Sequence, residues 1–115
     1  MRVEERLVGN VLVVTIQDIR LDAIVAAPLH QRLHQHTQNG CNKLVLDLGS
    51  VEFMDSSGLT VIMSTLKSLN EQGGRLVLSG MGANLGSLFQ LTRLDKVFQV
   101  YPNTGQAVLA LSYSK

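Results

Sequence analysis

Two serine hydroxyls and a carboxylate stand together in the segment Asp55-Ser56-Ser57-Gly58. The apolar run before it, at residues 43–48, predicts a buried strand, and the apolar residues after it recur at helical spacing. The segment is therefore expected at the start of a helix, where the first N–H groups lack partners within the helix and the dipole is positive. A phosphate on one of these hydroxyls would find free N–H donors there. The junction is a candidate phosphorylation switch.

A plain helix cap is the competing interpretation of the same residues. Asp and Ser are among the most favoured N-cap residues, typically worth ~1 kcal/mol, and many helices begin this way without a further function. One cap needs one residue, whereas three polar residues stand between Met54 and Gly58. The junction also follows a strand expected near the centre of the sheet, where open α/β sheets present their sites. Residue types alone support the cap and the functional hydroxyl equally.

Length and composition predict a single globular domain over residues 1–115. Hydrophobic residues make up 45% of the chain and charged residues 17%, which indicates a packed core rather than disorder. The formal net charge is only +1, the sequence shows no basic stripe and no Trp, and there are only two Tyr and three Phe, so phosphate neutralisation and base stacking have little to work with. No direct nucleic-acid partner is expected.

The cellular location is predicted from three negative observations. The single cysteine, Cys41, excludes an intramolecular disulfide and indicates a reducing compartment. Residues 1–6 are charged and lack the apolar stretch of a signal peptide. No apolar run approaches the roughly 20 residues that span a bilayer. We expect a cytoplasmic protein with no membrane span.

Strands and helices alternate along the chain after an initial hairpin. Gly9-Asn10 between apolar segments 3–8 and 11–16 predicts that hairpin. The further predicted elements are a helix from about Asp22 to Asn39-Gly40, a strand at 43–48, a helix at about 57–70, a strand at 75–78, a helix around 85–92, a strand at 97–101 and a last helix capped by Asn103 or Thr104. The order ββαβαβαβα predicts an α/β fold with a mixed, mostly parallel sheet, led by the hairpin and flanked by about four helices.

Apolar spacing also predicts which side of each helix faces the core. The predicted inner residues are Val25, Leu29 and Leu33 in the first helix, Leu59, Ile62, Met63 and Leu66 in the second, Leu85, Leu88, Phe89 and Thr92 in the third, and Ala107, Val108 and Leu111 in the last.

Other motifs that carry chemistry are incomplete. His30 and His34 are spaced to share one side of a helix, but His36 points elsewhere and no further ligand completes a zinc set. The glycines of residues 80–86 follow a strand, yet their spacing misses the dinucleotide-binding pattern and favours a tight turn. Neither a Gly-Lys-Ser/Thr phosphate loop nor a Gly-x-Ser-x-Gly elbow occurs. The sequence predicts no metal and no cofactor.

A small hydrolase is a distant alternative. The Asp-Ser-Ser-Gly segment superficially resembles the Asp-Ser/Thr-Gly motif of aspartic proteases, which in small forms act as homodimers. The second serine interrupts that motif, and a helix rather than a turn follows it, so the paired-carboxylate geometry is not expected. The chain is not predicted to be an enzyme.

Residues 44–48 and 51–59 closely resemble the signature of the STAS-domain family, and specifically its bacterial anti-sigma factor antagonists. The resemblance continues through residues 73–78, 91–98 and 107–111, so it covers nearly the whole chain. The family fold, a sheet led by a hairpin and flanked by helices, agrees with the element order predicted above.

The resemblance implies a function as an anti-sigma factor antagonist that is regulated by phosphorylation. Its acceptor is Ser56, and its kinase is a GHKL-type serine kinase that doubles as the anti-sigma factor. The unmodified chain would bind this kinase and release its sigma factor, phosphorylation would end the binding, and a PP2C-type serine phosphatase would reverse it. The implied partner-binding residues are Asp22, Asp55, Ser56, Ser57, Gly58 and Leu59.

Two positions depart from the family pattern, and one alternative function remains within it. Ile19-Arg20 stands where a Gly-Glu pair is common, and Arg93 stands where Gly is common. The first departure alters the charge near the acceptor and so bears on the identity of the partner. A STAS domain can also be a regulatory subunit of a stress-sensing scaffold or of a lipid-transport ABC ATPase. Whether Ser57 is a second acceptor or only a cap stays open.

Overall fold

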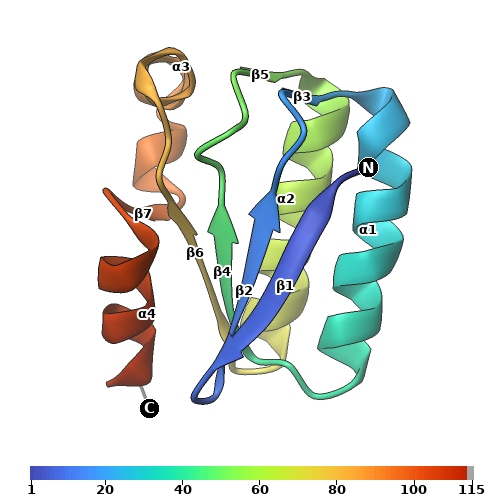
Figure 1. Ribbon diagram of the computed structural model, residues 1–115, viewed down its shortest axis with the longest axis vertical. Helices are drawn as coiled ribbons and strands as arrows, with labels where there is room; N and C mark the ends of the chain where they lie inside the picture. Colours follow the sequence, from blue (N-terminus) through green and yellow to red (C-terminus); the bar gives the residue numbers. More distant parts are fainter. Residues whose placement is uncertain (114–115) are drawn as a thin grey trace.

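A computed structural model describes residues 1–113, in which a five-stranded sheet lies between layers of helices (Figure 1). The strands are β1 (Val3–Val8), β2 (Val11–Ile16), β3 (Arg20–Leu21), β4 (Lys43–Asp47), β5 (Phe53–Met54), β6 (Arg75–Ser79) and β7 (Gln99–Tyr101). The helices are α1 (Ala23–Gln38), α2 (Ser56–Glu71), α3 (Ala83–Leu91), α4 (Thr104–Ser112) and the 3-10 helix η1 (Leu94–Lys96). The predicted α/β class and four α-helices are confirmed.

The main sheet has the order β1-β2-β4-β6-β7. Strands β1 and β2 form the predicted antiparallel hairpin, with Val8 opposite Val11 across the turn. Gly9 in that turn has φ +63°, a conformation that glycine adopts without a Cβ clash. All other neighbours in this sheet are parallel, so the predicted mixed, mostly parallel sheet is confirmed.

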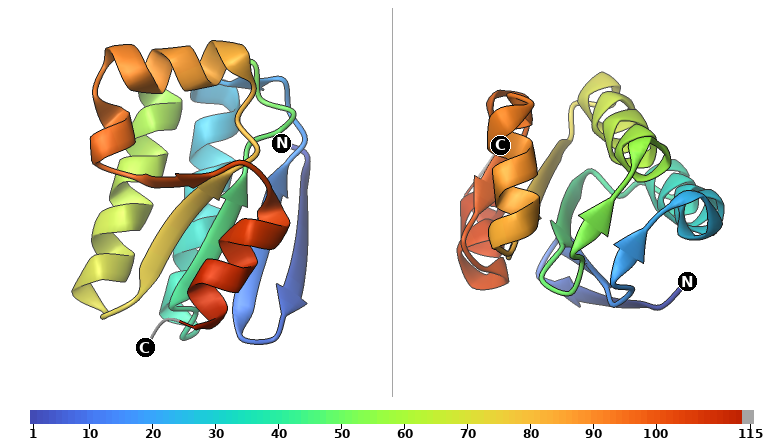
Figure 2. Two further views of the ribbon diagram at one scale, coloured as in Figure 1. Left: turned by 90° about the vertical axis from the view of Figure 1, so that its left-hand side faces the viewer. Right: turned by 90° about the horizontal axis from the view of Figure 1, so that it is seen from above.

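Two hydrophobic layers cover the two faces of the sheet (Figure 2). Successive side chains of a strand point to opposite faces, so Leu12 and Val14 of β2 pack in the larger cluster while Val11 and Val13 pack in the smaller one. Helices α1 and α2 lie over the first face and α4 lies over the second. Helix α3 crosses the end of the sheet at which the parallel strands finish.

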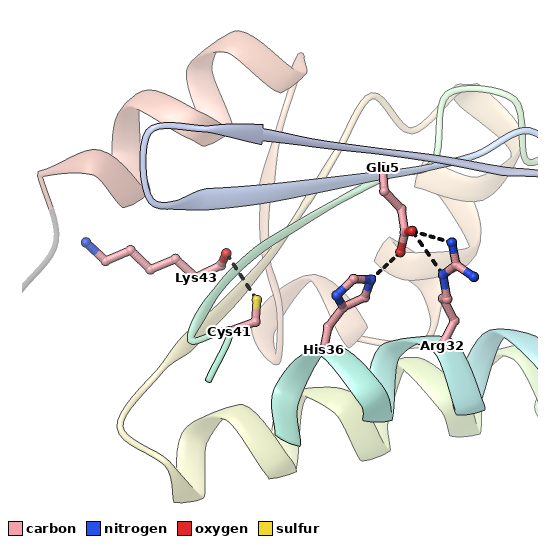
Figure 3. Close-up of polar contacts among 5 residues, drawn as sticks. All are labelled: Glu5, Arg32, His36, Cys41 and Lys43. Atoms are coloured by element: carbon pink, nitrogen blue, oxygen red, sulfur yellow. Dashed lines mark hydrogen bonds and ion pairs between the residues drawn. The ribbon is translucent and has the colours of Figure 1, made fainter. Parts of the chain in front are cut away.

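The hairpin is fastened to α1 by an ionic cluster (Figure 3). The Glu5 carboxylate of β1 accepts hydrogen bonds from Arg32 Nε at 2.9 Å and Nη2 at 2.7 Å, and it also contacts His36. The Arg32 hydrogen bond, with smaller contributions from His36, holds the pKa of the Glu5 carboxyl below its ordinary value of 4.5 despite partial burial. The same view shows Cys41, whose thiol contacts the Lys43 carbonyl and whose pKa is raised by burial.

The predicted inner face of α2 is partly wrong. Ile62 is buried as expected, but Met63 is 39% exposed, and Leu59 and Leu66 are only half-buried. The buried residues of α2 are Gly58, Val61, Ile62, Thr65 and Leu69. The buried face of α2 differs from the predicted one because small and hydroxyl-bearing residues fill the close contact with α1 and the sheet. A search for hydrophobic spacing does not detect such residues.

Two further details of the C-terminal half differ from the prediction. Leu88 is 37% exposed and Thr92 follows α3 as an exposed residue, so only Leu85 and Phe89 anchor that helix. The strand predicted from residue 97 begins at Gln99, because η1 ends immediately before Val97. Asn103, one of the two predicted caps, does cap α4, and its side chain accepts from Gln106 N at 2.8 Å.

Candidate functional site

Two short strands that the sequence did not predict position the candidate site. Strands β3 and β5 pair in parallel, with Leu21 opposite Met54, and form a separate ribbon beyond the carboxyl ends of β2 and β4. Each strand leads directly into a helix, β3 into α1 and β5 into α2. The ribbon therefore places the first residues of both helices side by side, at the same end of the molecule (Figure 1).

An aspartate caps each of these helices. Asp22 Oδ1 accepts from Ile24 N at 3.1 Å and Val25 N at 3.3 Å. Asp55 Oδ1 accepts from Ser57 N at 2.9 Å and Gly58 N at 3.2 Å. This arrangement brings Asp22 close to Asp55 and the serine pair, because Leu21 and Met54, the residues before the two caps, are register partners.

The cap occupies the N–H groups that a phosphate was expected to find free. Asp55 takes two of them through its carboxylate and a third through its carbonyl, which accepts from Leu59 N at 3.1 Å. The expectation of free donors is therefore wrong for Ser57, Gly58 and Leu59. It also follows that Ser57 is not the cap, since it donates to the capping residue.

Ser56 and Ser57 differ in exposure and in surroundings. Ser56 is exposed, and its hydroxyl has no hydrogen bond within the described part of the chain. Ser57 is half-buried. Ser56 is the first residue of α2, and its hydroxyl is thus more accessible to an enzyme than the Ser57 hydroxyl.

Ser56 lies where two surface grooves meet. One groove, of about 580 Å³, runs between α1 and α2, and Ala23, His30, Thr60 and Ser57 also line it. The other, of about 220 Å³, runs between α2 and α3 and is mostly apolar. Its walls are Met54, Asp55, Ser56, Leu59, Leu88, Phe89, Thr92 and Leu94. A partner that covers Ser56 therefore meets hydroxyls and small residues on one side and apolar side chains, including Leu59, on the other.

Gly58 lets α2 approach the ribbon closely. A Cβ built at this position would lie 2.5 Å from the Leu21 carbonyl oxygen and 2.7 Å from Leu21 Cγ. Any larger residue forces the start of α2 away from β3. Gly58 is one of the partner-binding residues that the sequence implied, and this contact gives a structural reason for a glycine there.

One feature of the site was not recognised from the sequence. The Arg20 guanidinium carbon lies over the Phe53 ring, 4.8 Å from its centroid, and both residues are exposed on the ribbon. Ile19, which precedes Arg20, is 57% exposed, and Ile24 in the first turn of α1 is 82% exposed. The only signal in the sequence was the departure at Ile19-Arg20 from the family's common Gly-Glu pair.

The histidines do not form a metal centre with other side chains. His30 and His34 are both exposed on α1, with stacked rings whose centroids are 6.0 Å apart. His36 lies at the Glu5 cluster instead. Within residues 1–113, no group of three or more His, Cys, Asp or Glu side chains could hold a metal ion. No helix in that range is long and apolar enough to cross a membrane.

Comparison with known proteins agrees with this arrangement of hairpin, sheet and helices. The family model of the STAS domain matches residues 2–107. The chain belongs to the STAS-domain family. The anti-sigma-B factor antagonist of Staphylococcus aureus strain NCTC 8325 / PS 47 is 32% identical over 84 residues, which are 73% of this chain and 78% of that protein.

Solved structures show the same STAS fold. An anti-sigma factor antagonist from Mycobacterium paratuberculosis superposes with a TM-score of 0.86 at 27% identity, over 96% of this chain and 93% of that one. SpoIIAA of Bacillus in its phosphorylated form gives a TM-score of 0.74 at 17% identity, over 93% and 96% of the two chains. At that identity, SpoIIAA shows the fold alone. The relatives of this STAS domain are thus anti-sigma factor antagonists, which are regulatory proteins.

Proposed function

We propose that this STAS domain, as a single unit over residues 1–115, is an anti-sigma factor antagonist switched by phosphorylation of Ser56. The unmodified chain binds a GHKL-type serine kinase that serves as the anti-sigma factor, and the kinase then releases its sigma factor. Phosphorylation of Ser56 ends the binding, and a PP2C-type phosphatase restores it. The chain itself is a cytoplasmic binding module with no catalytic activity.

The exposed, unbonded hydroxyl of Ser56 at the start of α2 is the observation that carries this proposal. A kinase must reach the oxygen atom and align it with a phosphoryl group, which an exposed first residue of a helix permits. The existence of SpoIIAA in a phosphorylated form supports a phosphorylated state on this fold. The names of the curated relatives support the anti-sigma factor as the partner.

The charges around Ser56 supply a mechanism for the switch. A phosphoserine carries about −1.5 to −2 charges at neutral pH. Here that charge stands next to the Asp55 carboxylate and near Asp22, while the cap already uses the N–H groups of Ser57 and Gly58. The phosphate charge is thus poorly compensated at the surface that the partner must cover. Repulsion or desolvation of about 1.4 kcal/mol already lowers the affinity tenfold.

The remaining residues of the site have distinct roles in this proposal. Asp22 and Asp55 fix the two helix starts and set the negative potential around Ser56. Gly58 brings α2 against the ribbon, and Leu59 lines the apolar groove that the partner covers. Ser57 contributes to the groove between the helices and is not the acceptor.

The test is phosphorylation of the purified chain by each GHKL-type kinase encoded in the source genome, with ATP. We expect one kinase to add a single phosphate, and peptide mass spectrometry to locate it on Ser56. Ser56→Ala should abolish the modification. The matched variant Ser57→Ala should be phosphorylated at no less than half the rate of the wild-type chain. Modification that persists in Ser56→Ala would overturn the assignment, and binding to a transporter ATPase without phosphorylation would favour the regulatory-subunit alternative.

A further inference from the structure

Arg20 is an exposed cation that lacks a polar partner in a site rich in carboxylates. It lies on β3 directly opposite Phe53 of β5, and its guanidinium stacks over the Phe53 ring. No hydrogen bond or ion pair to the Arg20 guanidinium occurs among residues 1–113. Its N–H donors are therefore available to another molecule.

The neighbouring carboxylates are mostly engaged by backbone groups. Residues 18–22 and 51–56 contain four acidic side chains and Arg20 as their one cation. The four are Asp18, Asp22, Glu52 and Asp55. Two of them cap helices, and Asp18 accepts from the backbone N–H of Arg2 at 2.7 Å. These bonds explain how an arginine can stay unpaired among acidic residues.

We propose that Arg20, held on the Phe53 ring, selects the partner by pairing with a carboxylate on the anti-sigma factor. This inference rests on the proposed function. A guanidinium offers several N–H donors in a planar fork, which matches the two oxygens of a carboxylate. Stacking on Phe53 orders the long side chain before binding, so less conformational freedom is lost when the pair forms.

The charge pattern defines the complementary surface. The partner presents basic side chains to the ribbon's carboxylates and one acidic side chain opposite Arg20. Phe53 under the guanidinium, Ile19 next to Arg20 in the chain and Ile24 in the first turn of α1 are exposed apolar residues, and a partner that buries them excludes water from the ion pair. A glutamate at position 20 would instead favour a partner that is basic at this point, so residue 20 discriminates between related anti-sigma factors.

The experiment measures, by calorimetry, the affinity of unmodified variants for the kinase that phosphorylates the wild-type chain. Arg20→Glu should bind at least tenfold more weakly, and Phe53→Leu several-fold more weakly, because it keeps an apolar residue but removes the ring. Arg6→Glu makes the same charge change at an exposed position of β1, away from the ribbon, and should bind within twofold of wild type. Arg20→Gln replaces Arg20→Glu if thermal unfolding shows that the latter does not fold.

A second step identifies the partner's carboxylate. Acidic residues on the kinase surface are changed to arginine one at a time, and one of these kinase variants should bind Arg20→Glu more tightly than it binds wild type. Failure of every such variant to rescue binding would contradict the ion pair.

The outcomes separate this inference from the proposed function. If no kinase binds or phosphorylates the wild-type chain, the proposed function fails. If the wild type is bound and phosphorylated but Arg20→Glu binds equally well, only the role of Arg20 is overturned. An effect confined to the Ser56-phosphorylated chain would also overturn it, because Arg20 would then serve the phosphate rather than the partner.

Discussion

Asp22 and Asp55 cap neighbouring helices from equivalent positions, each one residue beyond the register partners Leu21 and Met54. The paired strands β3 and β5 thus bring the starts of α1 and α2, with their two capping aspartates, to the same end of the molecule (Figure 1). A phosphate on Ser56 adds further negative charge to this pair. Under the proposed function, this geometry would make the site sensitive to phosphorylation, and the structure supports the quantitative predictions that follow.

Two substitutions separate the contribution of the Asp55 cap hydrogen bonds to stability from the contribution of the Asp55 charge. Asp55→Ala removes the acceptor for Ser57 N and Gly58 N, so the free energy of unfolding should fall by about 1 kcal/mol. Asp55→Asn keeps a capping oxygen, and Asn and Asp are similarly favoured at the N-cap. This variant should therefore lower the free energy of unfolding by at most a few tenths of a kcal/mol. Urea unfolding measures both. Equal losses in the two variants would mean that the charge, and not the cap hydrogen bonds, stabilises α2.

Gly58 should not tolerate a methyl group. The added Cβ of Gly58→Ala meets the Leu21 carbonyl at 2.5 Å, so the variant should lose about 1–3 kcal/mol of stability, as overpacked sites do. A Cβ at Gly86 in α3 would have no atom within 4 Å beyond its chain neighbours and the backbone of its own helix, and Gly86→Ala should gain up to ~1 kcal/mol from helix propensity. The same denaturation assay compares them, and a stable Gly58→Ala would contradict the close contact between α2 and β3.

Arg93 has φ +63°, the left-handed conformation in which a Cβ is strained. This conformation explains the family's common glycine at the position, where the chain departs from the pattern. A left-handed residue with a Cβ costs roughly 1–2 kcal/mol, and glycine removes this strain but has more freedom in the unfolded chain. The net result is that Arg93→Gly should be more stable than Arg93→Ala, which keeps the Cβ, by about 0.5–1 kcal/mol. Equal melting temperatures of the two variants would refute this explanation.

Glu5 should make stability depend on acid pH. Its pKa is lowered in the folded chain, so it contributes stability above its unfolded value near 4.5, and that contribution is lost as pH falls through the lower folded value. Glu5→Gln should therefore reduce the loss of stability below about pH 4.5 relative to wild type. Urea midpoints measured from acid to neutral pH give this difference. Parallel pH curves for the two proteins would show that Glu5 is not responsible.

Much of the fold follows from simple patterns in the sequence. The Gly9-Asn10 turn predicts the hairpin, and the alternation of strands and helices after it predicts a mixed, mostly parallel sheet; the structure confirms both. Strands β3 and β5 could not be predicted, because two residues are too few to show a period. These strands bring the two helix caps together. The sequence therefore predicts which residues belong to the site but not their arrangement in space.

The error on α2 and the left-handed conformation of Arg93 both depend on tertiary structure. Hydrophobic spacing favoured Met63, yet α2 buries Gly58 and Thr65 against its neighbours. Backbone conformation at Arg93 is likewise imposed by the connection from α3 to η1, and nothing in the local residue types indicates it. The stack of Arg20 on Phe53 joins residues 33 positions apart in the sequence, so only the structure reveals it.

The central claim is that phosphate on Ser56 ends the binding of the anti-sigma factor. The most direct test is calorimetric titration of the cognate kinase with the unmodified chain and with the chain phosphorylated stoichiometrically at Ser56. We predict that phosphorylation weakens binding at least tenfold, about 1.4 kcal/mol, and that the phosphatase restores it. Equal affinities of the two forms would contradict the claim.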